Sequence, residues 1–245
     1  MGELLVLGSY GIDGLAGPRQ VRVWLPRDFR REKARPVLYL FDGQNVFGDH
    51  GSYAGGWHAN DAVDKLSPRT NYPPIVVGID HGGSKRIEEL GRPAVTDRLL
   101  AWMGQTLMPD VRSRFGAIDG PIGAVVGGSS MGGLAALYAH FRRPDLFGGA
   151  IAMSPSFWFG GRFIFPFVAR EPNPYVSRVY LDCGRGEGGG RMATLAEEMG
   201  RHLSHRGWSH TQVMVRIDPR GAHSERAWRR RLPKALRFMF TRARS

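Results

Sequence analysis

The chain has 245 residues, 42% of them hydrophobic, and it carries a formal net charge of +12 at pH 7. This length supports one sizeable core, and because no linker or internal repeat divides the chain, we expect a single domain over residues 1–245. One cysteine, Cys183, excludes an internal disulfide and a cysteine-based zinc cluster. The sequence has neither a signal-peptide pattern nor an apolar run of the ~18 residues that cross a bilayer, so we expect a cytoplasmic protein with no membrane partner.

Apolar runs bounded by turn residues recur along the chain and alternate with segments of helical period. In chain order, we expect strands at residues 21–25, 36–41, 74–79, 122–126, 148–153, 178–182 and 212–217. The expected helices cover residues 59–66, 96–115, 131–141, 192–205 and 226–240, and the second of them is kinked at Pro109. This alternation predicts an α/β fold with a mainly parallel sheet covered by helices on both faces. Functional groups are expected just beyond the carboxyl ends of its strands.

The positive charge is concentrated at the end of the chain, where residues 225–245 contain eight basic residues and one acidic residue. Such a segment can bind nucleic acid, but it is also typical of a solvated helix face. No nucleic-acid motif accompanies it, so we expect no nucleic-acid partner. We expect these arginines to lie at the surface, together with Arg19, Arg22 and Arg35.

The segment GSSMG at residues 128–132 follows an expected buried strand and opens an expected helix. It fits the pattern G-x-S-x-G, in which a nucleophilic serine occupies a sharp turn whose neighbours must be small. A glycine-rich dinucleotide-binding turn is the alternative, but the pattern G-x-G-x-x-G is absent there. We therefore predict Ser130 as a nucleophile, with the N-terminus of the following helix directed at the site.

A serine nucleophile needs a base and an acid. In α/β-hydrolases both follow the serine along the chain, the acid first and the histidine base after it. Of the histidines beyond Ser130, only His223 lies past the carboxyl end of the last expected strand. We expect the acid to follow the strand at residues 178–182. Glu187 in the loop GRGEGGG is preferred for its position, and Asp182 and Asp218 are the other candidates.

The oxyanion of such a reaction needs two backbone donors. We expect the N–H of Met131, directly after the nucleophile, and the N–H of Gln44, in the turn FDGQN that follows an earlier strand. Aromatic residues near strand ends could line a substrate pocket, and we select Trp158, Phe157 and Trp57. No metal site is expected, because turn chemistry accounts for the polar residues near Gln44, which are Asp42, Asn45, Asp49 and His50. No cofactor is expected either, because a serine nucleophile with a base and an acid needs none.

Several blocks of the sequence together resemble one family of α/β-hydrolases. They include YLFDGQNVF, PIVVGIDHGGSKRIEEL, GSSMGGLAALYA, FGGAIAMSPSFWF and GAHSERAWRRRLP. This family contains the esterase D type proteins, enterochelin esterases, feruloyl esterases and mycolyltransferases. The resemblance implies an α/β-hydrolase fold with a mostly parallel central sheet of about eight strands, helices on both faces and no large lid. Carried over position by position, it also implies Ser130, Glu187 and His223 as a triad and Gln44 as an oxyanion donor.

Together these residues predict a serine carboxylic-ester hydrolase that acts through a Ser-His-Glu triad and an acyl-enzyme intermediate. The expected partner is a small-molecule ester, and siderophore, feruloyl and simple acyl esters all remain open. An acyltransferase with the same triad and a catalytically inactive binding protein of the same fold are the alternatives.

Overall fold

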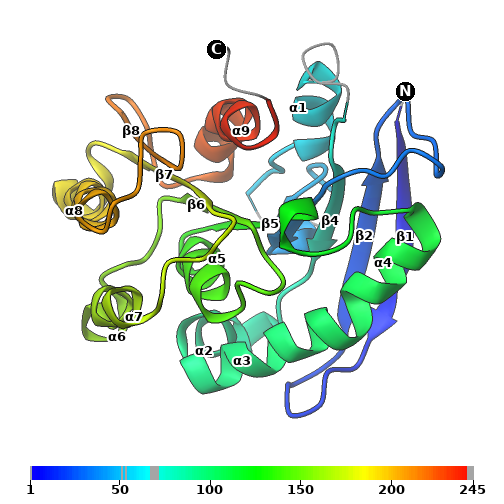
Figure 1. Ribbon diagram of the computed structural model, residues 1–245, viewed down its shortest axis with the longest axis horizontal. Coiled ribbons are helices and arrows are strands. Elements are labelled where there is room, and N and C mark those ends of the chain that lie inside the picture. Colours follow the sequence, from blue (N-terminus) through cyan, green and yellow to red (C-terminus); the bar gives the residue numbers. More distant parts are fainter. Residues whose placement is uncertain (1, 51, 53, 67–71, 242–245) are drawn as a thin grey trace.

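The computed structural model describes residues 2–50, 52, 54–66 and 72–241, and the eight strands in this part of the chain form one sheet (Figure 1). The strand order is β1-β2-β4-β3-β5-β6-β7-β8. β2 is antiparallel to both of its neighbours, whereas every pair from β4 to β8 is parallel, which confirms the predicted sheet. The strands are β1 (Glu3–Tyr10), β2 (Arg19–Leu25), β3 (Val37–Phe41), β4 (Ile75–Ile79), β5 (Ala124–Ser129), β6 (Gly149–Met153), β7 (Arg178–Gly184) and β8 (Val213–Asp218).

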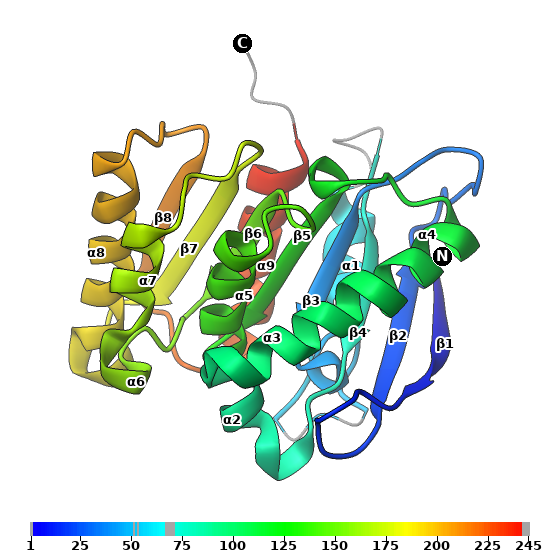
Figure 2. The same ribbon diagram turned by 60° about the horizontal axis from the view of Figure 1, so that its bottom comes forward.

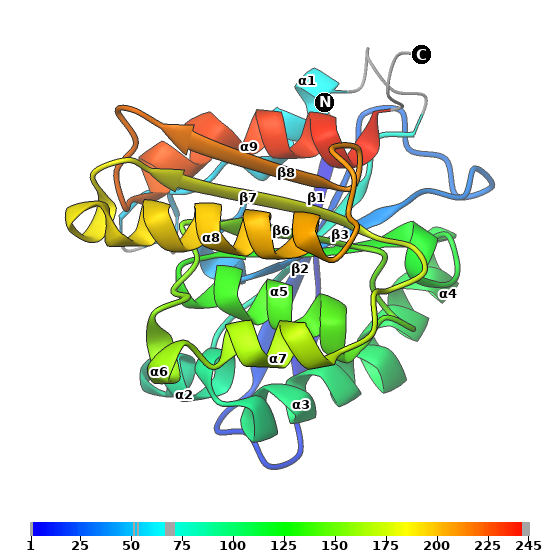
Figure 3. The same cartoon turned by 60° about the vertical axis from the view of Figure 1, so that its left-hand side comes forward.

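Helices cover both faces of the sheet, as predicted (Figure 3). α1 and α9 pack together on one face, while α5 lies against the middle of the other, on the face that also carries α3, α7 and α8 (Figure 2). None of the described helices has the length and apolar character needed to cross a lipid bilayer. The helices are α1 (Ala59–Leu66), α2 (Arg86–Gly91), α3 (Pro93–Trp102), α4 (Met108–Phe115), α5 (Met131–Arg142), α6 (Phe159–Arg162), α7 (Ile164–Arg170), α8 (Arg191–His205) and α9 (Glu225–Phe240).

The helix expected over residues 96–115 is interrupted in the structure. α3 ends at Trp102 and α4 begins at Met108, and the residues between them, Met103–Leu107, form a π-helical turn. Pro109 follows directly; it has no N–H to donate, and its ring crowds the preceding turn. A π-turn relieves this crowding by widening the helix, so the irregularity lies just before the proline rather than at it.

Two arginines that we expected at the surface are buried. Arg19 and Arg35 are each 1% exposed. Arg19 forms an ion pair with Glu89, and Arg35 donates to the backbone carbonyl oxygen of Asp28 at 2.7 Å. The surface prediction is wrong for both residues because buried cations are tolerated where carboxylate or carbonyl partners are available, and these partners lie on other segments of the chain.

Candidate active site

The turn between β5 and α5 holds Ser130 in a strained backbone conformation. Its φ and ψ are 57° and −119°, a region that residues other than glycine rarely occupy. Two backbone hydrogen bonds maintain it: the Ser130 N–H donates to the Met153 carbonyl oxygen at 2.9 Å, and the Ser130 carbonyl oxygen accepts from the Ser156 N–H at 3.0 Å. This is the strand–turn–helix geometry of a nucleophile elbow.

Two glycines allow the strand and the helix to approach each other at this turn. A Cβ atom at Gly128 would lie 2.6 Å from the backbone carbonyl carbon of Gly132, which no side chain can tolerate. The glycines two residues before and two residues after Ser130 are therefore required by backbone packing, as the pattern G-x-S-x-G predicts.

Two backbone N–H groups have the placement expected of oxyanion donors. Met131 is the first residue of α5, so its N–H has no acceptor within the helix. Gln44 is the middle residue of the 3-10 turn Gly43–Asn45, in which the next two N–H groups along the chain bond back to residues 42 and 43 and the Gln44 N–H takes no part. Asp42, which directly precedes this turn, lies against the start of α5: a Cβ atom at Gly132 would be 3.1 Å from its Oδ2.

His223 and Glu187 meet beyond the ends of β8 and β7. His223 Nδ1 is 2.8 Å from Glu187 Oε2; the glutamate side chain is 1% exposed and the imidazole 39% exposed. The Trp228 ring packs edge-on against the imidazole, with 5.0 Å between ring centroids. Burial favours a raised pKa for Glu187, but hydrogen bonds from His223, a backbone N–H and a serine, together with an arginine charge, lower that pKa below its usual value. An ionised carboxylate thus adjoins an imidazole that solvent can reach.

Three successive glycines follow Glu187 in left-handed backbone conformations. The φ angles of Gly188, Gly189 and Gly190 are 57°, 65° and 88°. Other residues cost about 1 kcal/mol or more in this region, so the glycine run lets the chain turn sharply directly after the acid. The Glu187 carboxylate itself reaches back to the end of β7, where Oε1 accepts a hydrogen bond from the Gly184 N–H at 2.7 Å.

Ser130 and His223 are not hydrogen-bonded to each other in this conformation. Among the described residues, the hydroxyl partner of Ser130 is Ser156 Oγ, 3.3 Å away. Catalytic hydrogen bonds are often long or poorly aligned without substrate and tighten when it binds. The structure thus brings His223 and Glu187 together, and it joins Ser130 to Ser156 rather than to His223.

The two other carboxylates considered as the acid have different partners. Asp182 is wholly buried within β7, with Oδ2 3.3 Å from the guanidinium Nε of an α9 arginine. Asp218 pairs with Arg230 at 2.9 Å. Of the three candidates, Glu187 is the one whose carboxylate bonds His223 in the described part of the chain.

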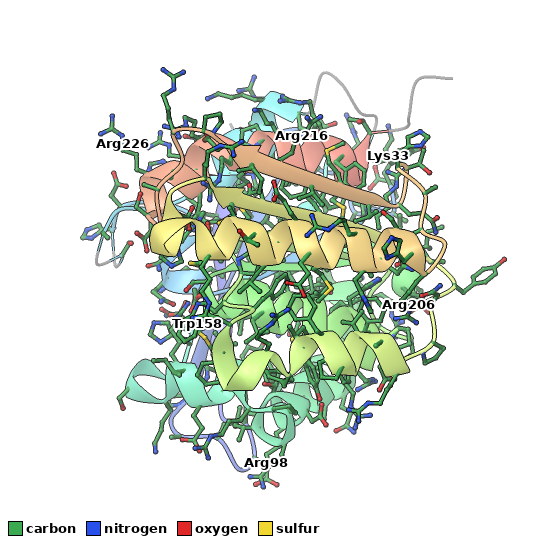
Figure 4. All side chains as sticks on the ribbon, turned by 90° about the vertical axis from the view of Figure 1, so that its left-hand side faces the viewer. Lys33, Arg98, Trp158, Arg206, Arg216 and Arg226 are labelled. Carbon is green, nitrogen blue, oxygen red and sulfur yellow. The ribbon has the colours of Figure 1, made fainter. Side chains whose placement is uncertain are left out.

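Only one of the three aromatic residues selected for a substrate pocket reaches the surface. Trp158, 44% exposed, projects outward at the end of the molecule that also carries Arg226 (Figure 4). Phe157 is wholly buried, and Trp57 is 1% exposed and packs against Trp228. In this conformation, Phe157 and Trp57 support the site from the core and do not contact solvent.

Three residues near Glu187 and Ser130 were not selected from the sequence. Ser154 directly follows β6 and Ser156 comes two residues later. Arg231 of α9 is 4% exposed, with Nη1 3.3 Å from Glu187 Oε1. The serines could have been found, because they follow the carboxyl end of a strand. Arg231 could not, because nothing in the sequence separates it from the other basic residues near the C-terminus. The prediction that these arginines lie at the surface is wrong for Arg231.

A strained serine between a parallel strand and a helix, with a histidine–carboxylate pair beyond later strands of the same sheet, defines an α/β-hydrolase fold. A family model agrees with this class: the family described as "Putative esterase" matches residues 13–239. The chain belongs to this esterase family, as its sequence blocks predicted.

Individual relatives come from the same group. The iron(III) enterobactin esterase of Dickeya dadantii is 30% identical over 244 residues, which cover 91% of this chain and 52% of that protein. The corresponding enzyme of Escherichia coli O6:H1 is 33% identical over 150 residues, 60% of this chain and 35% of that protein. This chain therefore spans about a third to a half of these relatives' lengths.

Solved structures share the fold. The enterobactin esterase from Shigella flexneri, determined in the presence of enterobactin, superposes with a TM-score of 0.78 at 23% identity. The superposition covers 98% of this chain and 58% of that one. At this level of identity the likeness establishes a common fold.

Proposed function

We propose that this protein is a serine carboxylic-ester hydrolase in which Ser130 is the nucleophile, His223 the base and Glu187 the acid that orients the base. The observation that carries the proposal is the 2.8 Å contact between His223 Nδ1 and Glu187 Oε2, at the sheet edge where Ser130 has its strained backbone. Membership of an esterase family supports the same reaction class. An inactive binding protein would have no need of an ionised acid held against an exposed imidazole.

In the acylation step, Ser130 Oγ attacks the ester carbonyl carbon while His223 Nε2 removes the hydroxyl proton. The Met131 and Gln44 N–H groups hold the negative charge that develops on the carbonyl oxygen, and losing one such donor costs about 3–4 kcal/mol of transition-state stabilisation. The imidazolium, stabilised by ionised Glu187, then gives its proton to the leaving alcohol. An ester between the substrate acid and Ser130 remains.

In the deacylation step, water takes the place of the alcohol. His223 removes one of its protons, and the hydroxide attacks the acyl carbon. When the tetrahedral intermediate collapses, Ser130 Oγ recovers its proton and the carboxylic acid leaves. The exposure of the imidazole gives water access to the base.

Siderophore esters are the first substrates that we propose. Two relatives of this chain are iron(III) enterobactin esterases. The net charge of +12 favours an anionic ester through long-range attraction, and the exposed Trp158 ring offers a surface for an aryl group. Feruloyl and simple acyl esters form the other arms of the test.

The test compares the wild type with Ser130→Ala on an enterobactin-type trilactone, methyl ferulate and p-nitrophenyl butyrate. We expect the wild type to hydrolyse at least one of them and Ser130→Ala to lose at least about 1,000-fold in kcat. Ser177→Ala is the matched control, because it removes a buried serine that bonds a different histidine, His140, at 2.6 Å. Equal rates for the wild type and Ser130→Ala on every ester would overturn the proposal.

A further inference from the structure

The hydroxyl of Ser154 lies at the centre of a buried network behind the acid. Ser154 is wholly buried and has a left-handed φ of 42°. Its Oγ is 2.9 Å from Trp228 Nε1, 2.7 Å from Arg231 Nη2 and 2.9 Å from Glu187 Oε1. An indole N–H and a guanidinium N–H can only donate, so both lone pairs of Oγ are occupied. The single hydroxyl proton of Ser154 must therefore point to Glu187.

The hydrogen bond from the Ser154 hydroxyl determines which oxygen of Glu187 is available to His223. Its Oε1 accepts from the Ser154 hydroxyl, from the Gly184 N–H at 2.7 Å and from Arg231 Nη1 at 3.3 Å. With three donors on Oε1, the carboxylate is held as an acceptor, and Oε2 alone faces His223. His223 Nδ1 must then donate, which leaves Nε2 without a proton and available as the base.

The donors that act on Ser154 come from one face of α9. Trp228 and Arg231 are three residues apart, so they project from the same side of the helix. Trp228 also packs edge-on against His223, and Arg231 lies under the loop that carries His223, where a Cβ atom at Gly221 would be 2.5 Å from Nη1. Arg231 Nε is also 3.3 Å from Asp182, so this cation lies between two buried acidic side chains.

We propose that Ser154 and Arg231 are positioning residues for the acid of the triad, and that the indole N–H of Trp228 orients Ser154. Ser154 and Arg231 bond Oε1 of Glu187, and Trp228 bonds Ser154, so that Oε2 keeps one orientation toward His223. All three side chains are buried, and through these hydrogen bonds they act on the reaction by way of the carboxylate; the Trp228 ring also contacts His223 directly. The inference rests on the proposed function, because it assigns a role within that triad.

The test measures kcat, KM and the pH dependence of kcat/KM for Ser154→Ala on the best ester of the panel. Removing a hydrogen bond to a buried carboxylate is expected to lower kcat by about 10- to 100-fold and to change KM by about twofold or less. The acid limb of the pH profile should move to lower pH, because a less firmly held carboxylate stabilises the imidazolium of His223 less well. Ser177→Ala, which removes a buried serine that bonds His140 instead, should change none of these quantities.

Two further variants separate this role from a general loss of stability. Trp228→Phe keeps an aromatic ring beside His223 but deletes the indole N–H, so it should lower kcat several-fold and shift the acid limb in the same direction. Arg231→Lys should retain more activity than Arg231→Met, because a lysine keeps one charged donor. If Ser154→Ala does not fold, Trp228→Phe decides the question.

The outcomes separate this inference from the proposed function. The positioning role would be refuted if Ser154→Ala keeps the wild-type kcat and an unshifted pH profile while Ser130→Ala is inactive; the proposed triad would then stand. Where Ser154→Ala does not fold, the same result in Trp228→Phe would refute the positioning role. Full activity in Ser130→Ala would refute the triad itself. A loss of thermal stability in Ser154→Ala with an unshifted acid limb would also count against positioning, because a merely structural serine gives that result.

Discussion

Arg86 binds both carboxylate oxygens of Asp42, with Nε 2.6 Å from Oδ1 and Nη2 2.7 Å from Oδ2. Asp42 has a left-handed φ of 60° and directly precedes the 3-10 turn that carries Gln44. The bidentate pair therefore connects α2 to the loop that is expected to supply one oxyanion donor. A guanidinium is suited to this task, because its planar fork fixes both the position and the orientation of a carboxylate.

Replacing Arg86 with methionine is expected to lower kcat by about 10- to 100-fold, which is less than complete loss of one oxyanion donor. The physical reason is that the Gln44 N–H is no longer held where negative charge develops. Lys85→Met is the matched control, because Lys85 is an exposed neighbour that pairs only with Glu88 among the contacts described for it. Steady-state kinetics on one activated ester measure the effect. A change confined to KM would contradict this account, since KM reports binding of the ground state.

Much of the parallel sheet could be predicted from the sequence, because its central strands are buried on both faces and read as short apolar runs. The runs at residues 36–41 and 74–79 predict β3 and β4 to within one residue at either end. β1 could not be predicted in this way. It is a mostly exposed edge strand, and its register with β2 shifts at Gly8, so it has little hydrophobic pattern.

The residues of the candidate site likewise include some that could be predicted from the sequence and some that could not. Ser130 and His223 could be selected because a turn motif and the order of loops along the chain depend on local sequence. Ser154 and Arg231 could not be connected to Glu187, because β6, β7 and α9 become neighbours only in the fold. The sequence therefore indicates the groups that we propose to react, whereas only the structure shows which side chains contact them.

The strain at Ser130 predicts an unusual order of stability among its variants. Ser130→Gly is expected to be more stable than Ser130→Ala by about 1 kcal/mol, because glycine accepts the positive φ without strain while alanine does not. Ser129 provides the control: it ends β5, where glycine should be less stable than alanine. Urea unfolding monitored by circular dichroism gives all four values. Alanine equal to or more stable than glycine at position 130 would show that the backbone there is relaxed.

The left-handed turn after the acid makes a second, independent prediction about glycine. Gly189→Ala should destabilise the fold by about 1 kcal/mol through its φ of 65° alone, since a Cβ atom there would meet nothing within 4 Å. Gly186 in the same loop is equally open but has a φ of −88°. Gly186→Ala should therefore be neutral or stabilise the protein by about 0.5 kcal/mol. Equal effects at the two positions would argue against the left-handed conformation.

Asp182 is expected to reduce the stability of the protein as the pH rises. Burial is the largest cause and raises its pKa to about 7; Arg231 opposes the shift, and Glu187 adds to it. The Tyr180 hydroxyl and the Ser154 N–H also face this group. When a carboxyl is protonated in the folded state but ionised in the unfolded state, the free energy of unfolding falls as the pH rises, so the folded protein becomes less stable. This loss of folding stability should develop between about pH 4 and pH 7 and stay constant above that range.

Asp182→Asn should remove this penalty, because its amide is neutral at every pH. The difference in melting temperature between Asp182→Asn and the wild type is expected to be small near pH 4 and to become increasingly positive toward pH 8. Asp218→Asn should behave in the opposite way: although burial favours a higher value, bonds from the Arg220 N–H and Arg230 lower the pKa of Asp218. That variant should be less stable than the wild type at neutral pH, with the difference vanishing in acid. Thermal scans at five pH values measure both trends, and a pH-independent difference for Asp182→Asn would mean that Asp182 stays ionised in the folded protein.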